Sequence, residues 1–218
     1  SWNILSDNRD KTVYLMDIAS AEIIKAIRLP ENWEPERFVL SALDPNLAWV
    51  SGINPTLQNE CTSRMGGLFR IDLADSSSEL LTEYCLDYGS GPLLALAPDE
   101  SALIVGGNPV SLFSASSGER LGTIPVADSA DFSSAAIAPD GTQVAFGVFG
   151  GRISFYSFPE LKKVQEWAPV SGEDEEWPMD LPDLVFTPDS TQLALLFNNS
   201  YVGTPVLLRM FTSEGWQQ

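Results

Sequence analysis

A short turn built around proline recurs four times along this chain, and it limits the possible folds more than any other feature of the sequence. The four copies occupy residues 41–46, 95–100, 136–141 and 185–190. Proline sets φ for the first central position of a turn, and the Asp or Asn that follows it can close the turn with its side chain. Apolar segments flank each copy, so each copy predicts a β-hairpin.

A second motif alternates with the first. An apolar segment ends in a polar residue and is followed by a small polar turn. Its copies are Val13–Asp17, Leu68–Asp72, Val110–Ser114, Ile153–Ser157 and Val206–Thr212. The two motifs together predict two hairpins, or four short strands, in each repeat, and no helical periodicity persists. The prolines of the first motif are 53, 41 and 49 residues apart. Such a period predicts an all-β fold, a β-propeller of four-stranded antiparallel blades.

The repeats resemble a known family at two places. Residues 138–146 (Ala-Pro-Asp-Gly-Thr-Gln-Val-Ala-Phe) resemble the SPDG hairpin of WD40-like and YVTN-type propellers, and residues 8–20 resemble the YVTN strand-turn-strand pattern. The Gly-His and Trp-Asp dipeptides of true WD40 repeats are absent. The resemblance implies a propeller. Some proteins with similar repeats are lactonases or periplasmic dehydrogenase subunits, but the fold by itself does not assign a function.

The predicted strands form one domain over residues 1–218. It has about five units, near 1–29, 37–86, 92–125, 132–167 and 182–218. The first and last units supply three strands each and the others four, a total of 18. Five closed blades need 20 strands. Either a strand is missed, or the chain is an arc or fragment of a ring whose open edges another segment or subunit pairs. We favour the second interpretation.

Charge and composition exclude several classes of function. The chain has 30 acidic and 12 basic residues, a net charge of −18, and no histidine. Such a charge disfavours binding to nucleic acid or to anionic lipid, and no apolar run is long enough for a membrane span. The lack of histidine excludes Ser-His-Asp and Cys-His nucleophile systems and most zinc and haem sites.

The long connections of the predicted blades all fall on one face, which is where binding usually resides. They cover residues 30–36, 51–67, 168–181 and 198–205. The predicted binding-face residues are Trp33, Glu34, Arg64, Trp177 and Tyr201. The alternative interpretation is that the charges are merely solvated and that the tryptophan rings pack over the blades.

An acidic run in one of these loops raises the question of a metal. Carboxylates and carbonyls are the ligands that calcium prefers. The candidate ligands are Glu173, Asp174, Glu175, Glu176 and Asp180. Their spacing matches no calcium-binding loop, and a run of charges is usually a solvated surface. We therefore expect no cofactor, with calcium kept as the alternative.

Cys61 and Cys85 are the two cysteines of the chain. They form either one disulfide or two free thiols. A disulfide would attach the 51–67 loop to its own blade. It would also favour a periplasmic or secreted protein over a cytoplasmic one, as would the low lysine content and a first residue, Ser1, that is not methionine. The glycine pairs Gly66–Gly67, Gly106–Gly107 and Gly150–Gly151 are expected in turns between strands.

Two hypotheses for the function follow. The first is a non-catalytic protein-binding propeller, or scaffold, that presents an acidic, tryptophan-bearing loop face and open sheet edges to a protein partner. The alternative is an extracytoplasmic propeller enzyme, a dehydrogenase- or lactonase-like subunit that uses carboxylates and calcium. The enzyme would need carboxylates that converge on a central channel, which a sequence cannot show.

Overall fold

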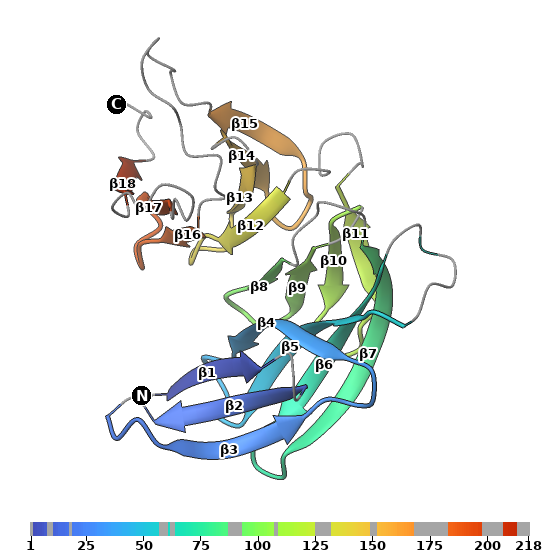
Figure 1. Ribbon diagram of the computed structural model, residues 1–218. Coiled ribbons are helices and arrows are strands. Elements are labelled where there is room, and N and C mark those ends of the chain that lie inside the picture. The colour runs from blue at the N-terminus through green and yellow to red at the C-terminus, as the bar shows by residue number, and fades with distance from the viewer. Residues whose placement is uncertain are drawn as a thin grey trace.

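The computed structural model describes residues 2–7, 11–17, 19–56, 61, 64–86, 93–106, 109–124, 132–148, 152–167, 183–197 and 207–212. In this part of the chain there are 18 strands and no helix, arranged in five antiparallel sheets (Figure 1). The sheets contain three, four, four, four and three strands in chain order, as the repeats predict. The prediction of an all-β chain built from four-stranded antiparallel units is confirmed at this level.

Every sheet is a meander in which consecutive strands pair. The first sheet consists of β1 (Trp2–Asp7), β2 (Thr12–Asp17) and β3 (Ile23–Arg28). The second consists of β4 (Glu34–Leu40), β5 (Leu47–Asn54), β6 (Arg64–Asp72) and β7 (Ser77–Leu86). The third consists of β8 (Leu94–Leu96), β9 (Ala102–Val105), β10 (Ser111–Ser114) and β11 (Arg120–Thr123). The fourth consists of β12 (Phe132–Ile137), β13 (Gln143–Val148), β14 (Arg152–Ser157) and β15 (Lys163–Trp167), and the fifth of β16 (Asp183–Phe186), β17 (Gln192–Phe197) and β18 (Leu207–Thr212).

The proline motif forms the turn between the first two strands of a sheet. In the third sheet the Glu100 amide donates to the Ala97 carbonyl at 2.9 Å, and Asp99 Oδ1 accepts from the Ser101 amide at 3.0 Å. The residue after the Asp is left-handed in three copies, with φ of 58° at Glu100, 69° at Gly141 and 60° at Ser190. The turn chemistry predicted from Pro and Asp is therefore the chemistry that makes the hairpin.

The second motif places a capping side chain at the end of the third strand. Asp72 Oδ1 accepts from the Ala74 amide at 2.7 Å, and Ser114 Oγ accepts from the Ser117 amide at 3.3 Å. After β2, Asp17 Oδ1 accepts from the amides of Ala19 and Ser20 at 2.8 and 2.9 Å. By its turn, β2 corresponds to the third strand of the larger sheets.

A β-bulge supports the same correspondence. In the second, third and fourth sheets, the fourth strand has one extra residue where it pairs with the third strand. In the first sheet, β3 has an equivalent extra residue where it pairs with β2. The extra residues are Ile24 in β3, Leu81 in β7, Leu121 in β11 and Val164 in β15. Thus β1–β3 correspond to the second to fourth strands of a complete sheet. The described part of the first sheet contains no counterpart of β4, β8 and β12.

The core lies between consecutive sheets. Four buried apolar clusters are present, and each joins one sheet to the next. The strands β4, β8, β12 and β16, which come first in their sheets, also contact one another in series. Figure 1 shows the first three sheets in the lower part of the molecule and the last two above them. The structure thus shows serially packed antiparallel sheets, and the propeller that the repeats predict, whether a closed ring or an arc of one, stays a prediction.

No described residue belongs to a helix long and apolar enough to cross a membrane.

Candidate functional site

The two cysteines form a disulfide. Cys61, in the connection between β5 and β6, is bonded to Cys85 near the end of β7, and their Cα atoms lie 5.3 Å apart. Cys61 is buried and its Sγ lies 3.9 Å from Met65 Sδ. The disulfide alternative is therefore confirmed, and the bond attaches the long β5–β6 connection to the outer strand of its own sheet.

Trp33 lies in the core between the first and second sheets, with 5% of its surface exposed. Its ring packs edge-on against Phe69, with centroids 5.2 Å apart, and it occupies the space beside Gly67, where a Cβ would come within 2.6 Å of the ring. The predicted role of Trp33 on an exposed binding face is therefore wrong. Its position agrees with the alternative interpretation, a ring packed over the sheet, because an indole among carboxylates still gains more from burial than from water.

The glycine pair in β6 was expected in a turn, and this expectation is also wrong. Gly66 and Gly67 both lie inside the strand. A Cβ on Gly66 would meet the Tyr84 ring at 2.4 Å, on the opposite face of the sheet from Trp33. Successive residues of a strand face opposite sides, so the pair makes room for one aromatic ring on each face. Burial raises the pKa of the Tyr84 hydroxyl, although the neighbouring Ser51 hydroxyl opposes this rise.

Glu34 and Arg64 are the predicted binding-face residues that remain partly exposed. Glu34 begins β4 and Arg64 begins β6, and both strands begin at the same end of the second sheet. Glu36, also in β4, interacts electrostatically with both. Partial burial raises the pKa of the Glu36 carboxyl, while the charges of Arg64 and Arg37 lower it. These residues form a small mixed-charge cluster at the long-loop end of the sheet.

Trp177, Tyr201 and the proposed calcium ligands Glu173, Asp174, Glu175, Glu176 and Asp180 lie outside the described residues. Within the described ranges, no three His, Cys, Asp or Glu side chains gather closely enough to hold a metal ion. The calcium hypothesis therefore stays a prediction that concerns the 168–181 segment.

The first strands of four sheets line a cleft of about 300 Å³, and none of the residues predicted for a binding face belongs to its lining. Arg37 of β4, Leu94 of β8, Ser134 of β12 and Asp183 of β16 all line it. Ser133, also in the lining, donates from Oγ to the Gly147 carbonyl at 3.1 Å. The cleft therefore combines one carboxylate and one guanidinium with serine hydroxyls, which suits the binding of a small polar group. The lining residues are separated by up to 147 positions in the chain, and no local motif marks them.

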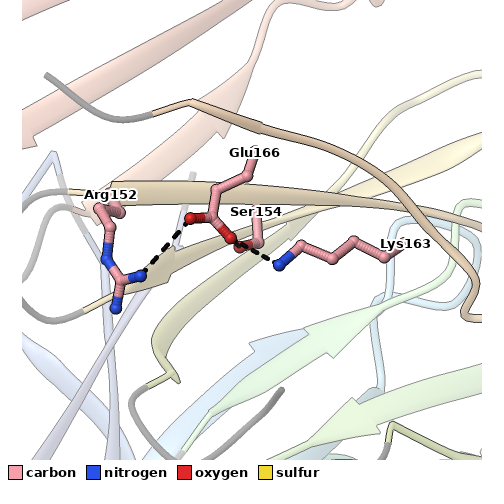
Figure 2. Close-up of polar contacts among 4 residues, drawn as sticks. All are labelled: Arg152, Ser154, Lys163 and Glu166. Atoms are coloured by element: carbon pink, nitrogen blue, oxygen red, sulfur yellow. Dashed lines mark hydrogen bonds and ion pairs between the residues drawn. The ribbon is translucent and has the colours of Figure 1, made fainter.

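A second charged cluster lies on β14 and β15, the last two strands of the fourth sheet (Figure 2). Glu166 accepts a hydrogen bond from Lys163 Nζ at 2.5 Å and pairs with Arg152 at 3.4 Å, and the Ser154 hydroxyl lies 3.4 Å from the same carboxylate. The hydrogen bond from Lys163 is the main reason why the pKa of Glu166 is lowered. Because the cations compensate the carboxylate at an exposed place, the cluster is a surface ion-pair network.

The sequence matches no protein-family model and no curated protein with which it was compared.

Proposed function

We propose that this chain is a non-catalytic protein-interaction module with a β-propeller fold, working outside the cytoplasm. The observation that carries the proposal is the edge of β1. Among the described strands β1 pairs with β2 alone, at the place where the second to fourth sheets each have a further first strand. A strand edge that lacks a neighbouring strand is a template for another strand, and the addition of a strand is a recurring mode of protein recognition.

The packing of the sheets supports the propeller part of the proposal. In a propeller the blades stack face to face around an axis, with the first strand of each blade innermost. The series of contacts through β4, β8, β12 and β16, with one apolar cluster for each pair of neighbouring sheets, has this form. A ring would bring the fifth sheet towards the first and would place the added strand on β1 next to the axis.

The disulfide supports the location. Disulfides persist in oxidising compartments and are rare in the cytosol, where thioredoxin and glutathione keep thiols reduced. The bond between Cys61 and Cys85 therefore favours a periplasmic or secreted protein.

Site-specific cross-linking tests the role of the β1 edge. A photoreactive amino acid is placed at Leu5 of β1 and, as a matched control, at Asp75 in the exposed turn after β6. The protein is irradiated in the cells that naturally make it, and the products are identified by mass spectrometry. We expect Leu5, and not Asp75, to cross-link to one defined strand of a partner protein. A cross-link from Leu5 to another segment of the same chain would mean that the edge closes within the molecule and would contradict the interaction role. Equal, diffuse labelling from both positions would contradict the proposal.

The enzyme hypothesis requires several carboxylates that converge on a central channel. Of the described residues that line the 300 Å³ cleft between the first strands, only Asp183 supplies a carboxylate. Calcium would have to be held by the 173–176 run. Calorimetric titration with CaCl₂ tests this alternative: binding that is abolished when all four residues of the run are changed to their amides would favour a calcium-dependent enzyme. Without such binding, the interaction module remains the better proposal.

A further inference from the structure

Side chains from the proline turns link neighbouring sheets at two places. Glu100, in the turn of the third sheet, reaches the turn of the second sheet. Its carboxylate accepts hydrogen bonds from the Ser41 hydroxyl at 2.6 Å and from the amides of Ala42 and Leu43 at 2.6 and 3.0 Å. Ser190, at the same position of the fifth sheet, accepts from the Asp140 amide of the fourth sheet at 2.9 Å. Each link closes the space between two adjacent turns.

The fourth sheet lacks this link because the equivalent residue is Gly141. Its φ of 69° matches that of Glu100 and Ser190, so the turn has the same conformation. Glycine has no side chain to reach back to the turn of the third sheet, and a Cβ on Gly141 would have no atom within 4 Å. The space beside this turn is therefore open.

A cleft of about 620 Å³ occupies the space, between the third and fourth sheets. Both proline turns line it, together with Leu121 of β11 and the Phe158–Pro159 pair that follows β14. Leu121 is the bulge residue of its strand and is 54% exposed. Its counterpart in β7, Leu81, is partly buried against the third sheet, where it packs beside Gly118. The bulge residues Ile24 and Val164 are exposed as well, at 43% and 65%, so Leu121 is one of three uncovered aliphatic side chains at this position of the strand, and of the three it is the one that lines this cleft.

The walls and the rim of the cleft define the chemistry of an occupant. Three prolines in the lining, Pro98, Pro139 and Pro159, offer no amide donors, so the walls favour apolar contacts. The rim carries the carboxylates of Asp99 and Asp140, and no cationic side chain belongs to the lining. The hydrogen bond from the Ser101 amide lowers the pKa of Asp99 and keeps it ionised. Both the rim and the net charge of −18 select a basic ligand.

We propose that the cleft between the third and fourth sheets docks an extended segment of a partner protein in which a large apolar side chain is flanked by lysine or arginine. The apolar side chain fills the space beside Leu121, and the flanking cations lie against Asp99 and Asp140. The volume of about 620 Å³ is within the usual range for a pocket that takes a small molecule, and one large side chain is smaller than such a ligand. The inference rests on the proposed interaction role, but it concerns a surface formed by other sheets than the β1 edge.

Selection from a phage-displayed random peptide library tests the inference on the intact, oxidised chain. We expect peptides with an aromatic or aliphatic residue flanked by Lys or Arg to be enriched. Their affinity, measured by fluorescence anisotropy with synthetic copies, should fall at least tenfold in Leu121→Lys. Gly141→Glu should have the same effect, because it restores the residue that closes the equivalent space at Glu100.

Leu43→Lys is the matched control, since Leu43 is 72% exposed on the turn of the second sheet, outside the cleft, and the charge change is identical. It should keep the wild-type affinity. Equal losses in Leu43→Lys and Leu121→Lys would reveal mere attraction to an acidic protein and would overturn the inference, as would a selection that enriches no such peptides. Thermal unfolding of each variant verifies that it folds. The cross-linking from Leu5 is independent, so either proposal can fail without the other.

Discussion

Trp33 shows how a single residue depends on partners that are remote in the chain. Its neighbours in the sequence are acidic, and a local pattern of this kind is typical of an exposed loop. The ring is nevertheless buried, because Phe69 supplies an edge-on contact and Gly67 supplies the room. The gain from burying an aromatic surface exceeds the cost of ordering the loop when such a space exists.

Trp33→Ala should therefore behave as a core truncation. We expect the free energy of unfolding to fall by about 3–5 kcal/mol, the usual range for a buried Trp→Ala change. Urea denaturation followed by circular dichroism measures it. Leu43→Ala, at an exposed position, should change stability by no more than about 0.5 kcal/mol. A loss of stability in Trp33→Ala as small as that in the control would mean that the Trp33 side chain is exposed and not buried.

Glu36 is a charged residue whose partly buried environment disfavours its ionised form. Partial burial raises the pKa of its carboxyl above the ordinary 4.5, so the folded state prefers the protonated form. A raised pKa stabilises the fold below pH 4.5, and this contribution is lost as the pH rises through the folded value. Glu36→Gln cannot ionise, so it should shift the urea midpoint upward at pH 7 and leave it nearly unchanged at pH 3. A lower midpoint at pH 7 would mean that attraction to Arg64 and Arg37 outweighs burial.

At the scale of elements, one arrangement of strands is repeated with small local changes. The proline turn, the capping side chain and the bulge recur at matched places, and three glycines in or beside strands, Gly66, Gly67 and Gly106, lie where a neighbouring element comes too close for a Cβ. Gly106 follows β9, and its amide donates to the Leu93 carbonyl at 3.0 Å. A Cβ there would lie 2.3 Å from the backbone nitrogen of Leu93.

Gly106→Ala should consequently push β8 away from β9, since backbone cannot yield as a flexible side chain does. We expect a loss of about 1–3 kcal/mol, the usual cost of overpacking. Gly122→Ala is the matched control, because its Cβ would meet only Leu161 Cδ1, at 3.8 Å. Chemical denaturation of both variants compares them directly. Similar stability in the two variants would contradict the close approach of β8.

The disulfide joins two parts of the second sheet. Its removal should nevertheless lower the free energy of unfolding of the whole chain. Cys61 and Cys85 are 24 positions apart. Closing a loop of this length lowers the entropy of the unfolded chain enough to stabilise a fold by about 3 kcal/mol. The double variant Cys61→Ser/Cys85→Ser should lose about that much in denaturant titrations under oxidising conditions. Wild type treated with a reductant should then match the double variant. A reductant effect that persists in the double variant would point to another cause.

At the scale of the molecule, self-repulsion and packing oppose each other. The five sheets are held together by four apolar interfaces. The burial energy of these interfaces must outweigh the repulsion that comes from a net charge of −18 at pH 7. Several carboxylates in the turns stabilise the folded state only while they are ionised. Hydrogen bonds from the turns themselves lower the pKa values of Asp17, Asp75, Asp99 and Asp189 below 3.8.

These charges predict a particular dependence on pH and salt. The lowered carboxyl pKa values contribute stability above pH 3.8, and this stability is lost as the pH falls through the folded values. Repulsion, by contrast, weakens between pH 7 and the isoelectric point near 4.1. Calorimetry should therefore find the highest Tm on the acid side of neutrality and a fall below pH 3.8. Sodium chloride at 0.5 M should raise Tm at pH 7 and have little effect near pH 4.1. A Tm that is independent of salt at pH 7 would contradict the role of repulsion.

The sequence by itself determined the class of the fold, because its determinants are local. Pro and Asp act within a turn of four residues, strand alternation acts within a strand, and these interactions were enough to place 18 strands in five groups. Only the tertiary structure decided the burial of Trp33, the joining of Cys61 to Cys85 and the two clefts. Each of these depends on space between elements that are distant in the chain. The cleft beside Gly141 is the clearest case: the same turn is closed or open according to whether its third residue can reach the neighbouring sheet.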